Sequence, residues 1–164
     1  MSAAHNPRPI DALDMLEADH RAIEQLFDAF ERAERDDYER KNTLVQRACE
    51  LLTIHAIVEE EMLYPVAQNA LTADQRIDVD EAYVEHFLVK TLIERITSLR
   101  AGDDGFDATF KVLKENTTHH IEEEETTLFP EVRKTQMDLV AIGAKLAARK
   151  LALHEHIAET ALAH

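Results

Sequence analysis

The chain is poor in residues that interrupt helices and in residues that build strand-rich folds. Its 164 residues include only three Gly and four Pro, and aromatic side chains make up 5% of the total. Two of the prolines fall within residues 1–9, and the pair Gly102 and Gly105 marks a single loop. Long stretches therefore contain no helix breaker. These absences favour an all-α fold, and the length suits one domain with one hydrophobic core.

The sequence also lacks the features of several functional classes. Cys49 is the single cysteine, which excludes an internal disulfide framework. The formal net charge is −15 and no basic cluster occurs, so neither nucleic acid nor an anionic membrane is expected as a partner. No apolar run approaches the roughly 18 residues of a transmembrane helix, and residues 1–9 lack the apolar region of a signal peptide. These features predict a cytoplasmic protein.

Apolar residues at intervals of three and four define four amphipathic helices. The four stripes run over residues 13–30, 44–62, 79–96 and 106–127. Short breaks separate them, which makes sequential helices antiparallel and predicts an up-down-up-down four-helix bundle. A fifth helical stretch near residues 138–162 is expected to pack outside the four. The predicted organisation is a flexible arm, a bundle and a C-terminal helical extension, over residues 1–9, 10–133 and 134–164.

The breaks between the stripes are legible in the sequence. Residues 34–38 form a polar linker, and Gly102 and Gly105 enclose two aspartates in another loop. Pro65 and Pro130 are each expected to stop or kink a helix, because proline removes a backbone donor and clashes with the preceding turn. Thr72 with Gln75 three residues later has the pattern of a capping box.

Each of the four stripes carries one inward histidine: His20, His55, His86 and His120. Two residues on adjacent antiparallel helices share a depth when they lie equally far from the connecting loop. Each successive pair of these histidines is centred on one of the three breaks. At about 1.5 Å rise per residue, the four imidazoles should therefore lie in one layer to within roughly a turn.

Two glutamates follow the same logic. Glu59 lies four residues after His55, and Glu124 lies four residues after His120, so each pair shares one helix face. The block from His55 to Pro65 recurs 65 residues later, with His, Glu, Glu, Leu, an aromatic residue and Pro in register. The dipeptides Asp19-His20 and Glu85-His86 recur at an offset of 66. The chain is thus a two-fold repeat of a helical hairpin.

Four imidazoles and two carboxylates are too many ligands for a tetrahedral structural zinc. The set suits two ions that accept mixed nitrogen and oxygen ligands, such as iron or manganese, and two opposed glutamates could bridge them. Without an ion, such a cluster in an apolar core would carry a heavy desolvation cost. His119 lies about 100° around the helix from His120 and is not expected to be a ligand. Glu60 and Glu125 are expected to lie outside the ligand set, near the ligands or in solvent.

These residues carry a resemblance to a known family. Over roughly residues 10–133, the sequence resembles the hemerythrin-like, HHE cation-binding family, through the two acid–His dipeptides, the two His-x-x-x-Glu-Glu motifs and their trailing prolines. The resemblance implies a four-helix bundle with an oxo- or hydroxo-bridged di-iron centre that meets O₂ or related small molecules. It also implies terminal ligands and bridging carboxylates at the following positions: His20, His55, His86 and His120 as terminal ligands, Glu59 and Glu124 as bridges.

One position departs from the oxygen-carrying members of that family. They have a further histidine one turn before the ligand of the third helix, where this chain has Ala82. One iron should therefore have an open position or a substitute ligand, for which Tyr64, Tyr83 and Glu17 are the candidates. This departure counts against simple reversible O₂ carriage and leaves room for peroxide or nitric oxide chemistry.

Three functions remain open from the sequence. The first is a non-enzymatic di-iron protein that binds or senses O₂ or buffers iron. The second is a di-iron enzyme that turns over hydrogen peroxide, as a catalase or peroxidase does, or nitric oxide. The third is an interaction bundle that metal only stabilises, with the fifth helix as its docking surface. Ala82 favours the second, and the absence of a recognisable substrate-pocket motif favours the first.

Overall fold

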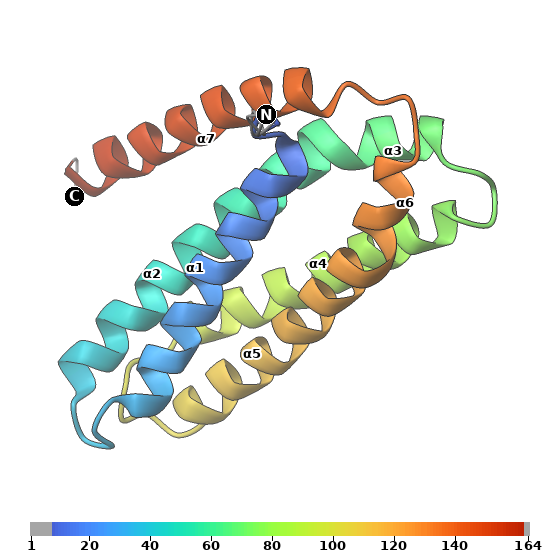
Figure 1. Ribbon diagram of the computed structural model, residues 1–164. Coiled ribbons are helices and arrows are strands. Elements are labelled where there is room, and N and C mark those ends of the chain that lie inside the picture. The colour runs from blue at the N-terminus through green and yellow to red at the C-terminus, as the bar shows by residue number, and fades with distance from the viewer. Residues whose placement is uncertain (1–7, 163–164) are drawn as a thin grey trace, which may run out of the picture.

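A computed structural model describes residues 8–162, and the regular structure of that range is entirely helical (Figure 1). The first seven residues of the predicted arm lie outside the described residues. Four long helices form an up-down-up-down bundle with an additional C-terminal helix, which confirms the predicted fold class. The bundle consists of α1 (Ala12–Arg32), α2 (Tyr38–Val58), α4 (Arg76–Thr97) and α5 (Phe106–Glu123). Three further helices are α3 (Tyr64–Ala70), α6 (Phe129–Arg133) and α7 (Leu139–Leu162).

A π-helical turn precedes each of the two inner prolines. These turns are η1 (Glu59–Leu63), which joins α2 to α3, and η2 (Glu124–Leu128), which joins α5 to α6. In η1 the Tyr64 N–H donates to the Glu59 carbonyl, and in η2 the Phe129 N–H donates to the Glu124 carbonyl. The chain therefore continues in helical form past Pro65 and Pro130 instead of stopping there. Because a π turn hydrogen-bonds each residue to the fifth one before it, it places Tyr64 one turn beyond Glu59.

The expected capping box before α4 forms, but it lies ahead of the helix. The Thr72 N–H donates to Gln75 Oε1 at 3.1 Å, and the Gln75 N–H donates to Thr72 Oγ1 at 3.4 Å. Residues 73–75 form a turn, and α4 begins at Arg76. The reciprocal contacts thus order the turn that leads into the helix.

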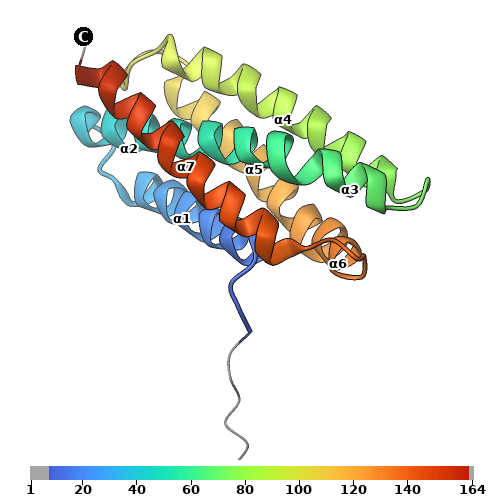
Figure 2. The ribbon, with the colours of Figure 1, turned by 90° about the horizontal axis from the view of Figure 1, so that it is seen from above.

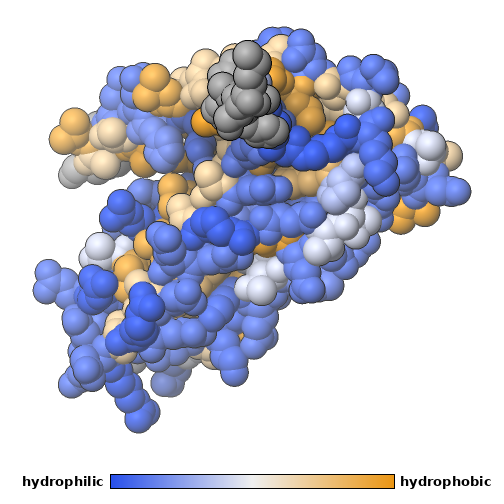
Figure 3. Space-filling view, viewed as in Figure 1, coloured by the Kyte–Doolittle hydropathy of each residue, from blue (hydrophilic) through white to orange (hydrophobic). Residues whose placement is uncertain are grey.

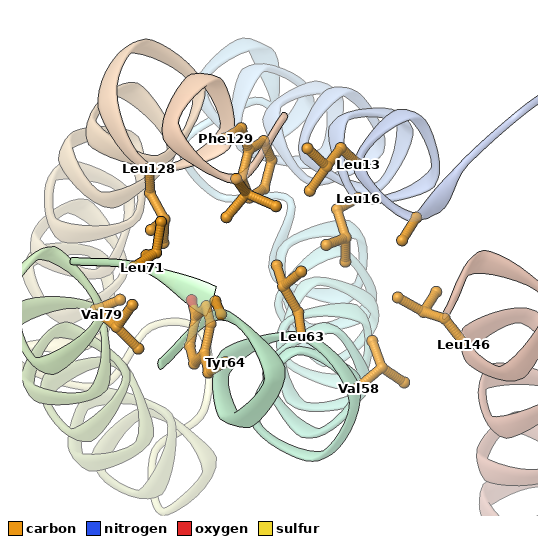
Figure 4. Packing of buried hydrophobic residues seen from close by; sticks show 14 residues of the cluster. Leu13, Leu16, Val58, Leu63, Tyr64, Leu71, Val79, Leu128, Phe129 and Leu146 are labelled. Atoms are coloured by element: carbon orange, nitrogen blue, oxygen red, sulfur yellow. The ribbon is translucent and has the colours of Figure 1, made fainter. Parts of the chain in front are cut away.

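Two apolar clusters fill the bundle, one at each end. The cluster near α3, α6 and α7 includes Leu13, Leu63, Tyr64 and Phe129, whose side chains point inward from the surrounding helices (Figure 4). The cluster near the other end is built on aromatic and aliphatic side chains of the four long helices: Ile23, Phe27, Val45, Ala48, Cys49, Leu52, Val89, Ile96, Phe106, Phe110 and Leu113. The inward histidines fall between the residues of these two clusters along every long helix. Both clusters therefore shield that polar layer from water.

Helix α7 packs against α1 and α2 outside the four-helix bundle, as expected (Figure 2). Gly143 and Leu146 are its buried residues. A Cβ added at Gly143 would lie 2.9 Å from the backbone N of Ala12 and 3.1 Å from the backbone C of Asp11. Polar contacts also hold α7: Arg149 Nε lies 2.8 Å from Glu61 Oε2, and the Lys150 ammonium donates to Asp19. The glycine permits a close approach that a side chain would prevent.

Gly143→Ala is expected to lower the thermal melting temperature by a few degrees. In an open helix the same change stabilises by about 1 kcal/mol, because alanine has the higher helix propensity. At this position the new methyl group meets backbone that cannot rotate away, and overpacking of this kind costs about 1–3 kcal/mol. Circular dichroism melts of parent and variant measure the difference. A higher melting temperature in the variant would show that α7 does not pack as closely as described.

The face of the molecule in Figure 3 is covered mainly by hydrophilic side chains, with scattered apolar ones. This agrees with a chain of which 31% of the residues are charged. Within residues 8–162, no helix combines the length and the apolar character needed to cross a membrane.

Candidate metal centre

Six buried polar side chains meet in one layer between the two apolar clusters. They are His20 and His55 from the first hairpin, His86 and His120 from the second, Glu59 at the start of η1 and Glu124 at the start of η2. None of the six residues is more than 5% exposed. These are the six residues that the sequence analysis singled out, and the structure brings all of them together.

The six side chains fall into two overlapping groups. His20 and His55 form one group with both glutamates, and His86 and His120 form the other with the same two glutamates. In each group the ligand-type atoms lie within 4.8 Å of one another, so each group could hold a metal ion. The glutamates therefore lie between two potential ions, in the place that bridging carboxylates would occupy.

The ring nitrogens of each histidine pair approach closely. His20 Nε2 lies 3.1 Å from His55 Nε2, and His86 Nε2 lies 3.1 Å from His120 Nε2. His55 Nε2 is 2.8 Å from Glu59 Oε1, and His120 Nε2 is 2.6 Å from Glu124 Oε1. These two short contacts join residues four apart in sequence and occupy equivalent places in the two halves of the repeat.

An outer carboxylate lies near the Nδ1 atom of every one of these histidines. His55 Nδ1 is 3.0 Å from Asp19, and His120 Nδ1 is 2.9 Å from Glu85. The corresponding contacts of His86 with Glu60 and of His20 with Glu125 are longer, 3.3 Å and 3.6 Å. A carboxylate that accepts from Nδ1–H fixes the tautomer, leaving the Nε2 lone pair directed into the layer. Metal-bound histidines in proteins are commonly oriented by this type of contact.

The layer is electrostatically incomplete as a purely protein structure. Inward lone pairs on two imidazoles that lie 3.1 Å apart repel unless a cation or a proton lies between them. Both oxygens of Glu59 and Oε1 of Glu124 are buried without a hydrogen-bond donor. Buried groups of this kind carry a desolvation penalty that an ion would offset. The donor set of four nitrogens and two carboxylates fits two transition-metal ions.

The pKa values of the layer respond to this crowding in opposite directions. Burial and the neighbouring His55 lower the pKa of His20 to about 3. Burial also acts to lower the pKa of His55, but the Glu59 and Asp19 carboxylates outweigh it and raise the value to about 10. Burial and the nearby Glu59 raise the pKa of Glu124 to about 7. Neighbouring side chains of the layer therefore differ widely in how readily they bind a proton. Bound cations would favour the deprotonated form of all of them.

The two halves of the layer differ at one aromatic position. Tyr64 and Phe129 are equivalent in the repeat, but only Tyr64 brings a polar atom. Its hydroxyl is 3.2 Å from His86 Nε2 and donates to Glu124 Oε2 at 3.2 Å. Phe129 instead stacks on the His20 ring, with ring centroids 5.9 Å apart. The phenol therefore contacts two members of the group formed by His86, His120 and the two glutamates.

The Tyr64 phenol contacts His86, the residue one turn after Ala82. Of the other two candidates, Tyr83 packs edge-on against the Tyr64 ring, with centroids 5.1 Å apart. Glu17 belongs to neither metal-type group. Tyr64 is thus the one of the three whose polar atom contacts the layer.

Sequence reasoning located the six inner residues but missed the part played by Asp19 and Glu85. Each directly precedes an inward histidine, and each contacts the histidine of the neighbouring helix instead. The acid–His dipeptide was the available signal. Glu60 and Glu125 lie just outside the inner set, as expected. The side chain of His119 is 62% exposed and lies outside the layer.

The hemerythrin HHE cation-binding domain family matches residues 11–132, which include all six inner residues. The chain belongs to this family.

Individual relatives of this hemerythrin-like chain share under a third of its residues in the aligned regions. It is 28% identical over 120 residues to a DNA nickase of Nostoc and 26% identical over 121 residues to an uncharacterized hemerythrin-like protein of Schizosaccharomyces pombe. These alignments cover 73% and 74% of the chain, but only 33% and 59% of the two relatives. The chain thus spans a third of the first relative's length and somewhat over half of the second's.

A solved structure shares the fold. A hemerythrin HHE cation-binding domain-containing protein from Mycobacterium kansasii superposes with a TM-score of 0.75 and 23% identity, and the match covers 90% of this chain and 89% of that one. A high coverage on both sides means that the likeness extends beyond the central bundle. At this level of identity the likeness establishes the fold alone.

Proposed function

We propose that this hemerythrin-like chain is a di-iron protein, with His20 and His55 on one iron, His86 and His120 on the other, and Glu59 and Glu124 bridging. The observation that carries the proposal is the pair of overlapping groups that share both glutamates. Four nitrogen ligands and two carboxylates suit iron, and manganese is the nearest competitor. Both oxygens of Glu59 and Oε1 of Glu124 are buried without a hydrogen-bond donor, which supports a role as bridges.

A small molecule such as O₂, peroxide or nitric oxide is the expected ligand of this centre. When bound, the two irons would supply redox chemistry and an exchangeable position. Ala82 offers no donor there, and the Tyr64 hydroxyl contacts His86 and Glu124. O₂ binding or sensing, or iron buffering, is the first function that follows. The net charge of −15 argues against nucleic acid and anionic membranes as partners.

Peroxide turnover is the second candidate, and Tyr64 is the observation that favours it. The Tyr64 hydroxyl, which donates to Glu124, could turn its hydrogen to an oxygen atom placed beside it, whereas a nitrogen ligand at this place would have no such hydrogen to donate. An open position is what permits activation of small molecules at metal sites. The balanced reaction converts two molecules of hydrogen peroxide to one of O₂ and two of water. Nitric oxide could react at the same position, where two molecules, two electrons from an external reductant and two protons would give one N₂O and one water.

Optical spectra of the iron-loaded protein separate these functions. The reduced protein is first exposed to air, and peroxide is then added while O₂ release is measured. A reversible spectral change with air indicates O₂ binding, and release of one O₂ for every two peroxide molecules indicates turnover. If the iron-loaded protein responds to neither air nor peroxide, both O₂ binding and peroxide turnover are contradicted. Iron buffering and a metal-stabilised interaction bundle would then be the remaining functions.

Ala82→His is expected to slow peroxide decay and to lengthen the lifetime of any O₂ adduct. The new imidazole lies four residues before His86, on the same helix face, and fills the position that the parent leaves open. Tyr64→Phe is the companion variant: it removes the hydroxyl but keeps the ring, and should change the spectrum without changing the iron content. If Ala82→His binds iron normally and alters neither rate, the open position does not govern reactivity.

A further inference from the structure

The four outer carboxylates around the inner histidines are not equivalent. Three of them also contact a cationic side chain. Lys150 of α7 donates to Asp19, Lys90 Nζ lies 2.9 Å from Glu60, and Arg21 Nη2 lies 2.7 Å from Glu125. Each of these cations neutralises a carboxylate that is partly withdrawn from solvent.

Glu85, the fourth outer carboxylate, breaks this pattern. Its Oε1 accepts from His120 Nδ1 at 2.9 Å, but among the described residues no Lys or Arg contacts it. Its Oε2 is buried without a hydrogen-bond partner, and the imidazole nearest to that oxygen in the contacts of Glu85 is His119, whose Nε2 lies 3.7 Å away. In place of a Lys or Arg, Glu85 has two further glutamates near it. Glu81 lies one turn before Glu85 on α4, and Glu123 lies 3.1 Å from His119 on α5.

These four residues form a chelating arrangement on the α4–α5 surface. Glu81 with Glu85, and His119 with Glu123, are two i, i+4 pairs on adjacent antiparallel helices, which is the spacing that the buried His-x-x-x-Glu pairs use. One ligand-type atom from each of the four residues lies within 4.8 Å of the others. The proximity of Glu123 raises the pKa of Glu81, as expected for carboxylates crowded without a counter-ion.

A cavity of about 100 Å³ adjoins this cluster and leads inward. Glu81, Glu85 and Glu123 line it, together with Ala82 and Glu124. Glu124 is 2% exposed, and its Oε1 has no hydrogen-bond donor. The cavity therefore has carboxylates at its surface side and the buried carboxylate of Glu124 at its inner side. The small side chain of Ala82 contributes to the space between them.

We propose that Glu81, Glu85, His119 and Glu123 bind a further divalent transition-metal cation, which neutralises Glu85 as Lys150, Lys90 and Arg21 neutralise its three counterparts. One imidazole and three carboxylates suit Zn²⁺, Mn²⁺ or Fe²⁺. The cation would hold Glu85 against His120, and it would lie beside the cavity that reaches Glu124. This site is distinct from the buried centre and does not depend on what that centre reacts with.

Titration of the iron-loaded protein with Zn²⁺ by isothermal calorimetry tests the site, with iron content measured before and after. We expect one Zn²⁺ per chain beyond the retained iron. His119→Ala and Glu123→Gln should each weaken this uptake by about tenfold or more, since they remove a direct ligand. Glu122→Gln is the matched control, because it removes the same charge from an exposed neighbour on α5 that lies outside the cluster.

Three results would overturn the proposal. The protein could bind no Zn²⁺ beyond its iron, it could bind Zn²⁺ only with loss of iron, or His119→Ala and Glu123→Gln could bind it as tightly as the control. The first and third results would leave the proposed di-iron function intact, since both are read with the iron in place. Failure of the di-iron proposal would instead appear in the iron content itself.

Discussion

Removal of both ions with a chelator is expected to lower the melting temperature by about 10–20 °C. An ion held at about 100 times its dissociation constant stabilises the folded state by about 2.7 kcal/mol, and two such ions by about 5 kcal/mol. For a chain of this size each kcal/mol shifts the melting temperature by roughly 2–4 °C. Without ions, the facing imidazoles, both Glu59 oxygens and Oε1 of Glu124 would remain buried without hydrogen-bond donors in the middle of the bundle.

Circular dichroism melts with and without chelator measure this shift, with metal loss confirmed by elemental analysis. Re-addition of iron should restore the higher value, which separates loss of the ion from damage to the chain. Equal melting temperatures of the loaded and metal-free protein would contradict a metal-dependent core. A drop that iron does not reverse would point to irreversible unfolding instead.

His55→Ala and His120→Ala are expected to impair metal binding to a similar extent. The two histidines are equivalent in the repeat: each contacts the glutamate four residues later and an outer carboxylate on the neighbouring helix. Loss of even an outer contact of a metal ligand typically costs about 10–100-fold in affinity. Each variant should therefore lose at least about tenfold in affinity for one ion, as measured by competition with a chelator of known affinity.

His119→Ala is the matched control for this pair, because it removes an imidazole one residue from His120. Its side chain is 62% exposed and does not face the layer, so the buried centre should retain its ions. Loss of the buried ions in His119→Ala, together with their retention in His120→Ala, would contradict the orientation of α5. A large difference between His55→Ala and His120→Ala would contradict the equivalence of the two halves.

The inner layer was predictable because it rests on two regular periods. Residues four apart share a helix face, and residues equidistant from a short loop share a depth in an antiparallel pair. These rules place the four histidines and two glutamates at one depth in the bundle: His20, His55, His86, His120, Glu59 and Glu124. The stripes of apolar residues then show which face of each helix points to the core.

The contribution of Tyr64 could not be derived from those periods. In a continuous α-helix, the fifth residue after Glu59 lies about 140° around the axis, away from the layer. The π turn η1 brings it to about one full turn, so that the phenol reaches His86 and Glu124. Pro65 signals a break in the helix, but the residue alone does not distinguish a stop, a kink and a π turn.

The outer contacts depend on packing that the sequence pattern does not fix. Asp19 contacts His55 on α2 instead of the adjacent His20, because neighbouring residues on a helix point about 100° apart. Lys150 contacts Asp19 from α7, which lies close to the start of α1 at Gly143. Such contacts follow from the distance and rotation between helices, which a helical repeat leaves undetermined.

The metal content of the protein tests the central claim most directly. Protein produced in iron-supplemented medium, freed of loosely bound ions, should contain close to two iron ions per chain by elemental analysis. Two overlapping groups that share Glu59 and Glu124 predict this value. A stable content of one ion per chain, or zinc in a tetrahedral site, would contradict a di-iron centre.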